Sequence, residues 1–377
     1  MRVKKFILRA AIVLAVLVGF TGKVFLPNMA AHQSQDAAGG RDAMEASRDS
    51  HSEESPLDAG KIIISHVLDA HEWHFMTLPN GKDVAIYLPM ILIHEGKLHC
   101  FSSKHLYHSV THSHKGFEID ENENVIRRRD DGSLYESKVW DFSISKVVVG
   151  IFLGCIVVFF IFYGMARAYT RNRMKAPKGI WNAFEIAVIF VRDTIAIPSL
   201  GEKKYEKHMP FLLTVFFFIL INNVMGQIPN WPNVTGNIAV TLTLALFTFF
   251  ITAFNGNKHY WKEIFNPDVP MLMKFPIPLM PFIEFVGTLT KPFALTMRLF
   301  ANITAGHIVM LAFVCLIFLL GVNSFALGLG SSVLSIFLSL FMYLLELLVA
   351  FIQAFIFTLL SALYIGLATE EHHKEAH

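Results

Sequence analysis

The chain has 377 residues, of which 54% are hydrophobic and only 16% are charged, and its formal net charge is +2. Soluble globular proteins carry about 25% charged residues, so this composition, with a mean hydropathy of +0.48, indicates a membrane protein. The small net charge and the lack of a long basic stripe with interleaved aromatic residues argue against nucleic-acid binding. Two of the three cysteines lie in apolar segments, so no disulfide framework is visible.

The N-terminus predicts an exported protein. Residues 1–30 have a basic start (MRVKK) and a short apolar run (AAIVLAVLVGF), which is typical of a secretory signal peptide or an N-terminal anchor. Residues 31–59 are rich in Ser, Asp, Glu and Ala, which predicts a flexible linker. We therefore expect the residues that follow to lie outside the cytoplasm.

Residues 60–143 predict a small exported domain that is β-rich. The stretch FMTLPNGKDVAIYL contains a hairpin-like PNGK turn, and HEGK interrupts the β-like runs of AIYLPMILIHEGKLHCFSS.

This domain and the linker hold eleven of the chain's 17 histidines. They are His32, His51, His66, His71, His74, His94, His99, His105, His108, His112 and His114. The run HLYHSVTHSH raises the alternative of metal binding, but zinc sites need a defined ligand set, and no HExxH motif or cysteine pair accompanies it. We expect polar surface histidines and no metal site, and the role of the domain stays open between local proton tuning and metal binding.

Residues 144–377 predict an all-α polytopic membrane domain with about five transmembrane helices. The apolar segments are 147–163, 210–228, 238–254, 282–320 and 331–368. A partly apolar segment, 180–197, repeats apolar residues at helical spacing, which predicts an amphipathic helix at the cytoplasmic interface.

Loop charges predict the orientation of these helices. A cluster of five Lys and Arg residues over 167–178 follows the first helix, and loop 255–268 carries two lysines, whereas loop 229–237 has none. Because positive residues concentrate in cytoplasmic loops, the N-terminal domain is expected to be periplasmic and the C-terminus cytoplasmic.

The last two apolar segments are nearly forty residues long and are joined by GVNSFALGLGSS. Each would form a helix of about 57 Å, although the hydrocarbon core is only about 30 Å thick. These helices must either break or tilt strongly in the membrane. Pro292 is the candidate break point in the first of them. A tilted pair offers a long lateral surface to another membrane body.

Five polar residues stand out in these two helices: Arg298, Asn302, His307, Glu346 and Gln353. Arg298 and Asn302 are four residues apart and share a face, whereas His307 is about 180° away from Arg298. Arginine keeps its charge, while His and Glu exchange protons near neutral pH when their surroundings tune them. The pattern predicts proton or cation conduction that a fixed charge controls.

The stretch TKPFALTMRLFANITAGH resembles the signature of the a subunit of rotary ATP synthase. That signature has an arginine, Leu-Phe, a small residue and Asn, followed by Ala-Gly and a polar residue. The stretch LLVAFIQAFIFTLLSALYIGLATEEHH is similar to the last helix of that family, with Gln353 and Tyr364 at the expected positions, and PKGIWNAFE and LINNVMGQIPN match weaker patterns. The resemblance covers residues 141–377 and is of the bacterial type, here with an extended exported N-terminal region.

The resemblance implies a non-catalytic Fo subunit without a cofactor, in the bacterial inner membrane. It implies a c-ring, peripheral-stalk b subunits and the rest of the ATP synthase as partners, and two offset half-channels that lead protons to the ring. Arg298 would face the ring and block a short-circuit between the half-channels. The outer half-channel would be lined or supported by Asn302, His307, Glu346 and Gln353. Glu284 and Tyr364 would have supporting roles, Glu284 on the cytoplasmic exit path.

Some alternatives stay open. In some family members the acid and the imidazole at positions 307 and 346 are exchanged. A stand-alone secondary ion transporter is the main alternative function, but such proteins show internal repeats, and none is visible here. An intramembrane metalloenzyme would use His307 and Glu346 as ligands. The proton is the default ion, and sodium stays open because the choice depends largely on the c-ring.

Overall fold

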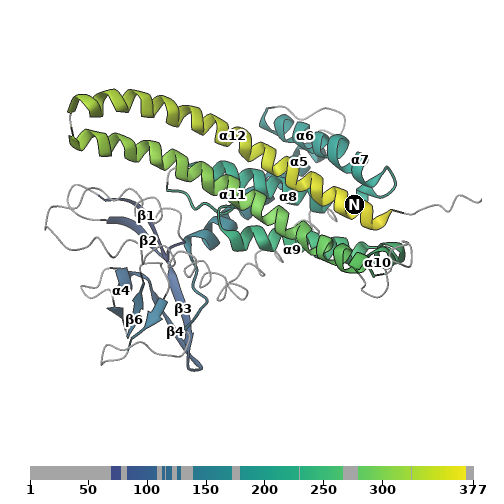
Figure 1. Cartoon of the computed structure of the whole chain (residues 1–377), viewed down its shortest axis with the longest axis horizontal. Coiled ribbons are helices and arrows are strands. Elements are labelled where there is room, and N and C mark those ends of the chain that lie inside the picture. Colours follow the sequence, from purple (N-terminus) through teal and green to yellow (C-terminus); the bar gives the residue numbers. More distant parts are fainter. Residues whose placement is uncertain are drawn as a thin grey trace, which may run out of the picture.

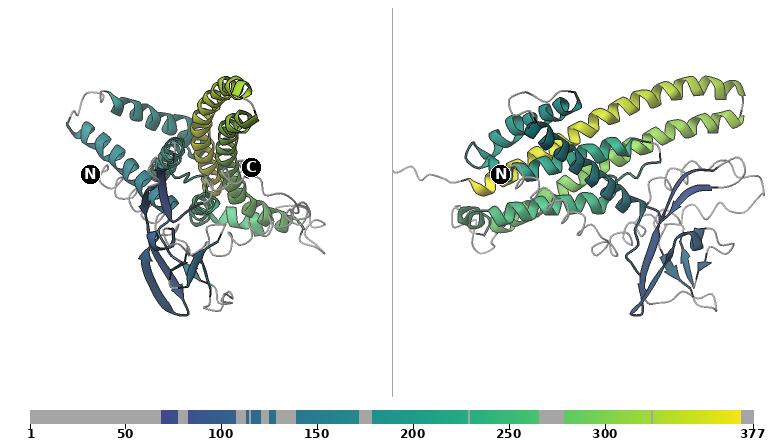
Figure 2. Two further views of the ribbon diagram at one scale, coloured as in Figure 1. Left: turned by 90° about the vertical axis from the view of Figure 1, so that its left-hand side faces the viewer. Right: turned by 180° about the vertical axis from the view of Figure 1, so that it is seen from behind.

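The computed structural model combines a bundle of long helices with a small β region at one side (Figures 1 and 2). It describes residues 69–77, 83–107, 113–114, 116–120, 125–128, 139–171, 179–228, 230–265, 279–323 and 325–370. The predicted signal segment and linker lie outside these residues, and so do His32, His51, His66, His108 and His112.

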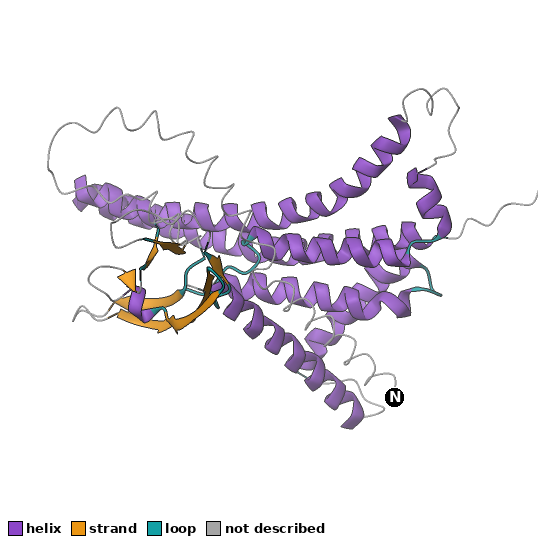
Figure 3. Ribbon diagram, turned by 90° about the horizontal axis from the view of Figure 1, so that it is seen from below, coloured by secondary structure: helices purple, strands orange, loops and turns teal. Residues whose placement is uncertain are grey.

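The predicted β-rich region is confirmed: its described residues form three small antiparallel sheets (Figure 3). One sheet pairs β1 (Glu72–Thr77) with β2 (Asp83–Tyr87). The second has the order β4-β3-β8, built from β3 (Pro89–His94), β4 (Lys97–Ser102) and β8 (Trp140–Asp141). The third contains β5 (Ser113–His114), β6 (Phe117–Ile119) and β7 (Val125–Arg127), and the short helix α4 (Lys104–Tyr107) follows β4.

The β3–β4 hairpin turns at the HEGK stretch, as its sequence predicts. Glu95 and Gly96 both have positive φ, of 49° and 74°, which is the conformation of a tight two-residue hairpin turn. Alternate residues of β3 are buried, and Met90 and Leu92 form a small core with Leu106.

The β region is joined to the first membrane helix, α5 (Lys146–Arg171), by polar contacts. The Asp69 carboxylate accepts a hydrogen bond of 3.3 Å from the backbone N–H of Val147, so it caps the start of α5. His71 lies 2.9 Å from Asp141, which precedes the same helix. These contacts hold the beginning of β1 against the beginning of α5.

Among the described residues, five helices are long and apolar enough to cross a membrane, which agrees with the number predicted for residues 144–377. Besides α5 they are α8 (Tyr205–Gly226), α9 (Ile238–Asn255), α11 (Leu279–Asn323) and α12 (Phe325–Thr369). Helix α8 is apolar on all sides, and residues 211–219 are all buried, as expected for a helix surrounded by others. It packs against α5 and α12, while α9 packs against α11.

The predicted amphipathic helix forms, but with a π-helical segment in its second half. It consists of α6 (Ile180–Phe190), the π-segment η2 (Val191–Ala196) and α7 (Ile197–Leu200). Val191 and Ile195 are fully buried, while Ile180 is exposed. A Cβ atom on Gly366 of α12 would lie 2.1 Å from the Ser199 carbonyl oxygen, so a glycine is needed where α12 crosses α7.

Helices α11 and α12 have 45 residues each and run side by side as a continuous antiparallel pair (Figure 1). Of the two alternatives for these helices, a break at Pro292 does not occur, because α11 continues through this residue. The predicted linker 321–332 is also wrong, since α11 ends at Asn323 and α12 begins at Phe325. Gly and Ser cost a helix only about 1 kcal/mol or less each, so they do not end it where the partner helix runs alongside.

The two ends of the bundle differ in their contacts. The β region and the α11–α12 turn lie at the same end, while α10 (Lys258–Phe265) and the C-terminal end of α12 lie at the other (Figure 1). At that second end Lys204 Nζ donates to the carbonyl oxygen of Thr369 at 2.6 Å, and the Asn257 N–H donates to Ala368 at 2.9 Å. These donors satisfy the last carbonyl groups of α12.

Candidate functional site

Arg298 and Asn302 both lie exposed on α11, on the face that their four-residue spacing predicts. Within the described part of the chain, the Arg298 guanidinium makes no hydrogen bond or ion pair. Apolar side chains of α11 and α12 are exposed along the same helix pair, including Phe293, Met297, Leu344, Leu345 and Leu348. A fixed positive charge therefore stands on an apolar surface with no partner supplied by the described residues.

His307 and Glu346 are brought together between α11 and α12. His307 Nδ1 lies 3.3 Å from Glu346 Oε1, and the two side chains are 12% and 4% exposed. Neither carboxylate oxygen of Glu346 accepts a hydrogen bond from a described residue. An acid and an imidazole in contact, shielded from the surroundings, can pass a proton from one to the other.

Gly306 makes room for this pair. A Cβ atom at position 306 would lie 3.3 Å from Glu346 Oε1, closer than ordinary van der Waals contact. The role of Gly306 beside the carboxylate was not predicted. The signal for it was the Ala-Gly pair in the motif, which could not reveal which side chain of the other helix would face the glycine.

Gln353 is buried on α12, two turns from Glu346, near further polar residues. Asn223 Nδ2 of α8 donates to the Ala350 carbonyl oxygen at 3.4 Å, and Thr235 Oγ1 donates to Asn223 Oδ1 at 2.6 Å. Sequence reasoning did not assign Asn223 or Thr235 to the site. The sequence marked them only as part of the polar stretch LINNVMGQIPNWPNVTGN. Residue spacing within one helix does not reveal which other helix packs against it, so their position beside α12 could not be predicted.

The loop between α8 and α9 adds buried polar atoms at the same end. Both amide atoms of Gln227, Trp231 Nε1 and Asn233 Nδ2 are buried and make no hydrogen bond to described residues. Buried polar groups without a partner cost about 1–3 kcal/mol each. Several such atoms therefore gather in the segment between α8 and α9.

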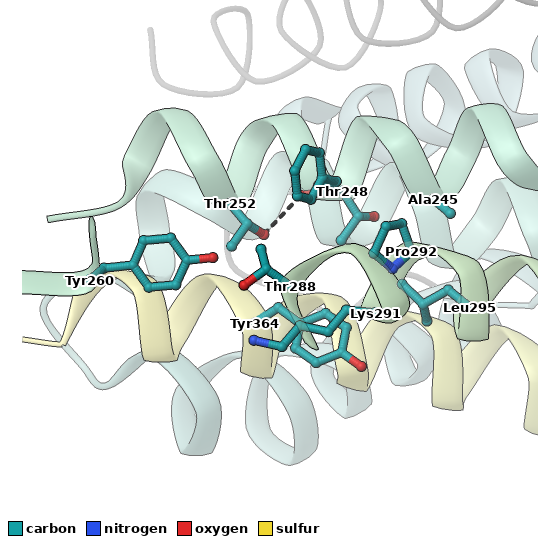
Figure 4. A pocket seen from close by; sticks show the side chains of 10 residues that line it. Ala245, Thr248, Thr252, Tyr260, Thr288, Lys291, Pro292, Leu295 and Tyr364 are labelled. Carbon is teal, nitrogen blue, oxygen red and sulfur yellow. Dashed lines mark hydrogen bonds between the residues drawn. The ribbon is translucent and has the colours of Figure 1, made fainter. Parts of the chain in front are cut away.

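A second polar site lies at the other end of α11 (Figure 4). Lys291 Nζ lies 5.4 Å from the centre of the Tyr364 ring, and both residues line a pocket with Thr288 and Tyr260. Burial raises the pKa of Tyr260 above its usual value, although a hydrogen bond with Thr288 acts in the opposite direction. The structure thus brings Tyr364 to a lysine that was not predicted as a site residue.

Glu284, Lys291 and Arg298 are seven residues apart on α11. Seven residues are close to two helical turns, so the three side chains follow one face of the helix. Glu284 is half-buried, and its backbone carbonyl accepts a hydrogen bond from Thr288. Thr288 also lines the pocket of Lys291 and Tyr364, so Glu284 lies one turn of α11 from a residue of this pocket.

Among the described residues, no group of three His, Cys, Asp or Glu side chains could hold a metal ion. His105 and His114 stack with their ring centres 4.8 Å apart, and His99 packs against Phe117.

Comparison with known proteins gives two family matches. The family model of the ATP synthase A chain matches residues 148–366, and a domain of unknown function (DUF8433) matches residues 62–142.

Three similar proteins are all named as a subunits of ATP synthase. ATP synthase subunit a 2 of Prosthecochloris aestuarii is 37% identical over 375 residues, which cover 97% of this chain and 94% of the relative. ATP synthase subunit a of Chloroherpeton thalassium is 42% identical over 246 residues, which cover 63% of this chain and 71% of the relative. A third relative, ATP synthase subunit a of an Anaeromyxobacter species, is 35% identical over 266 residues, 69% of this chain and 63% of its own length. The chain therefore belongs to the ATP synthase A chain family.

Proposed function

We propose that this chain conducts protons as a stator subunit of a rotary ATP synthase and catalyses no reaction itself. In this role it offers two offset half-channels to a ring of c subunits, so that proton flow drives rotation. The observation that carries the proposal is that α11 presents two different polar sites on different sides. The buried His307–Glu346 pair lies on one side of this helix, and the exposed Arg298 lies on another.

The outer half-channel is assigned to the polar groups near the β region. Protons enter along the polar atoms of Gln227, Asn233 and Asn223 and reach Gln353 and the carboxylate–imidazole pair. Asn302, one turn along α11 from Arg298, supports the transfer to the ring. The close contact of His307 with Glu346 supports transfer, because each group can hold the proton in turn.

Arg298 is assigned to the boundary between the half-channels. A guanidinium stabilises a carboxylate about 4 Å away by about 4 kcal/mol at an effective dielectric constant of about 20. It therefore favours the deprotonated form of a ring carboxylate as this passes. Because Arg298 does not release its own proton, protons cannot cross from one half-channel to the other through it.

The inner half-channel is assigned to Glu284, Lys291 and Tyr364. Glu284 lies toward the start of α11, and the pocket of Lys291 and Tyr364 lies between it and Arg298. On this side, Lys291 stabilises negative charge, either on a hydroxide in the half-channel or on a ring carboxylate that has released its proton. Tyr364 supplies a hydroxyl group from α12.

The orientation and the partners are part of the same proposal. The β region is periplasmic and the C-terminus cytoplasmic, which agrees with the lysines in and near α10 at the end opposite the β region. The exposed apolar residues along α11 and α12 suit a c-ring in the bacterial inner membrane. The peripheral-stalk b subunits are the expected partners of the remaining exposed helices.

Reconstitution in liposomes tests the proposal against a stand-alone transporter. We expect the chain to pass protons only when it is assembled with the c-ring, and the assembled ATP synthase to make ATP from a proton gradient. Ion transport by the purified chain without partners would favour the transporter. A sodium gradient in place of the proton gradient identifies the ion, and we expect no synthesis from sodium alone.

A further inference from the structure

Strand β1 is fastened to the loop between α8 and α9 by two hydrogen bonds of 2.7 Å. Trp73 Nε1 donates to the carbonyl oxygen of Asn230, and Asn230 Nδ2 donates back to the carbonyl oxygen of Phe75. The Trp73 ring is 7% exposed and meets the ring of Trp231 edge-on, with centroids 5.3 Å apart. We call Trp73, Phe75, Asn230 and Trp231 the loop clasp.

The backbone at Asn230 needs such support. Its φ is +63°, in the left-handed region, which asparagine enters more readily than most residues but at some cost in energy. A residue keeps such a conformation when its surroundings hold it there. The reciprocal hydrogen bonds of the loop clasp provide this hold from outside the membrane domain.

Beyond the clasp, the same loop packs tightly onto α5. Val234 is fully buried, and a Cβ atom on Gly150 of α5 would lie 2.7 Å from Val234 Cγ2 and 3.1 Å from Pro232 Cβ. The glycine therefore permits a close approach, and the loop is held between the clasp and the helix bundle.

The loop is hydrogen-bonded to α11 directly and is connected to α12 through Asn223 of α8, and these two helices carry the proton-transfer pair. Thr304 Oγ1 donates to the Gly236 carbonyl oxygen at 3.5 Å, three residues before His307 on α11. Thr235 bonds Asn223, which in turn donates to the carbonyl oxygen of Ala350, one turn after Glu346 on α12. A shift of the loop would therefore act on both sides of the pair.

We propose that the loop clasp is a positioning device for proton entry, by which the β region holds the α8–α9 loop in the geometry that admits protons to the His307–Glu346 pair. This inference rests on the proposed function. Trp73 and Asn230 are positioning residues, because neither touches His307 or Glu346 and both act through the loop. It assigns a role to the segment that matches a domain of unknown function.

Two mild substitutions test this in the intact ATP synthase. Trp73→Phe keeps an aromatic ring but loses the N–H donor, and Asn230→Asp keeps the shape and tolerates positive φ but loses the amide donor. Leu98→Ser, on the exposed surface of β4, is the control. The enzyme is reconstituted in liposomes, and ATP synthesis is measured against the proton concentration on the side that faces the β region.

We expect the proton concentration for half-maximal synthesis to rise about threefold or more in both clasp variants, with a smaller change in the maximal rate. Hydrogen exchange of residues 227–237 should accelerate in the same variants. Leu98→Ser should match the unchanged protein in both measurements.

An unchanged half-saturation point in both clasp variants would overturn the inference, whether or not the loop exchanges faster. Failure of both variants to assemble would also overturn it, since the clasp would then serve folding rather than proton entry. If the enzyme without substitutions makes no ATP from a proton gradient, the proposed function is wrong. This result is distinct from one that overturns only the role of the loop clasp.

Discussion

Nδ1 of His307 lies 3.3 Å from Oε1 of Glu346, across the contact between helices α11 and α12. Glu346 is buried, and neither of its carboxylate oxygens is hydrogen-bonded by a described residue. A structural ion pair in such a place would be expected to have its oxygens satisfied by further donors. The acceptor capacity of this carboxylate is unused by the described residues, which agrees with the proposed role in proton transfer.

The first prediction concerns this pair. Glu346→Gln removes the acid and should lower proton-driven ATP synthesis by about tenfold or more, because proton transfer by a positioned group contributes about 100-fold or more. Exchanging the two residues, His307→Glu with Glu346→His, restores one acid and one imidazole at the same contact. We expect the exchanged protein to recover a substantial part of the rate, as measured in liposomes.

The exchanged protein distinguishes a role in proton transfer from a role in helix packing. If Glu346→Gln loses activity and the exchanged protein stays equally inactive although it assembles, the pair does not work as a proton relay.

The second prediction concerns Gly306. Gly306→Ala brings a Cβ atom to 3.3 Å from Glu346 Oε1, so the carboxylate must shift by a few tenths of an ångström beside His307. We expect proton conduction to fall severalfold while the complex still assembles. The matched control is Gly287→Ala on the same helix, where a Cβ atom meets nothing within 4 Å. Equal conduction by the two alanine variants would contradict the proposed placement of Glu346.

The third prediction concerns Arg298. Arg298→Ala removes the fixed charge from the exposed face of α11, and we expect ATP synthesis driven by a proton gradient to be abolished in complexes that assemble normally. Passive proton leak should persist, because the groups assigned to both half-channels are unchanged. Coupled synthesis by an assembled Arg298→Ala enzyme would refute the proposed function. Arg192→Ala, an exposed arginine paired with Asp193 outside the five spanning helices, is the control.

The fourth prediction concerns the inner half-channel. Lys291→Met keeps the length of the side chain but removes the charge that lies over the Tyr364 ring. We expect a slower proton release to the side opposite the β region, seen as a lower rate of synthesis at a saturating proton concentration on the β side. The half-saturation point on the β side should stay unchanged, which separates this variant from those of the loop clasp. A shifted half-saturation point would argue against an inner location.

The sequence predicted the number of spanning helices, because runs of apolar residues are determined locally by the need to cross hydrocarbon. It also predicted that Arg298 and His307 would lie on different sides of one helix, because that follows from helical periodicity alone. It singled out His307 and Glu346 as groups that can exchange protons, but it could not give the distance between them. The register of one helix against another depends on packing. The sequence therefore did not predict that Gly306 lies beside Glu346, that Asn223 contacts α12, or which helices the α8–α9 loop contacts.

Helix ends were predicted less well than helix cores. The turn between α11 and α12 was placed over twelve residues on the basis of Gly and Ser, but only residue 324 separates the two helices. Pro292 likewise did not break α11. In both places a local propensity of a few kcal/mol or less was outweighed by the packing of one long helix along another.

The last prediction concerns His94, whose side chain is 1% exposed in the β region. Burial lowers the pKa of His94, and the nearby Arg127 lowers it further, whereas Glu95 acts in the opposite direction and His99 adds a smaller lowering effect. In the unfolded chain a histidine has a pKa of about 6.5, so below that pH the unfolded state binds a proton that the folded state resists. The stability of the β region is therefore fully present above about pH 6.5 and falls as the pH drops below it. Hydrogen exchange of residues 89–102 in the full-length chain, corrected for the intrinsic effect of pH, should show weaker protection at about pH 5 than at about pH 7.5. His94→Leu should reduce this difference, because it removes the titrating group from the core, and an undiminished difference would assign the pH dependence to other histidines of the region.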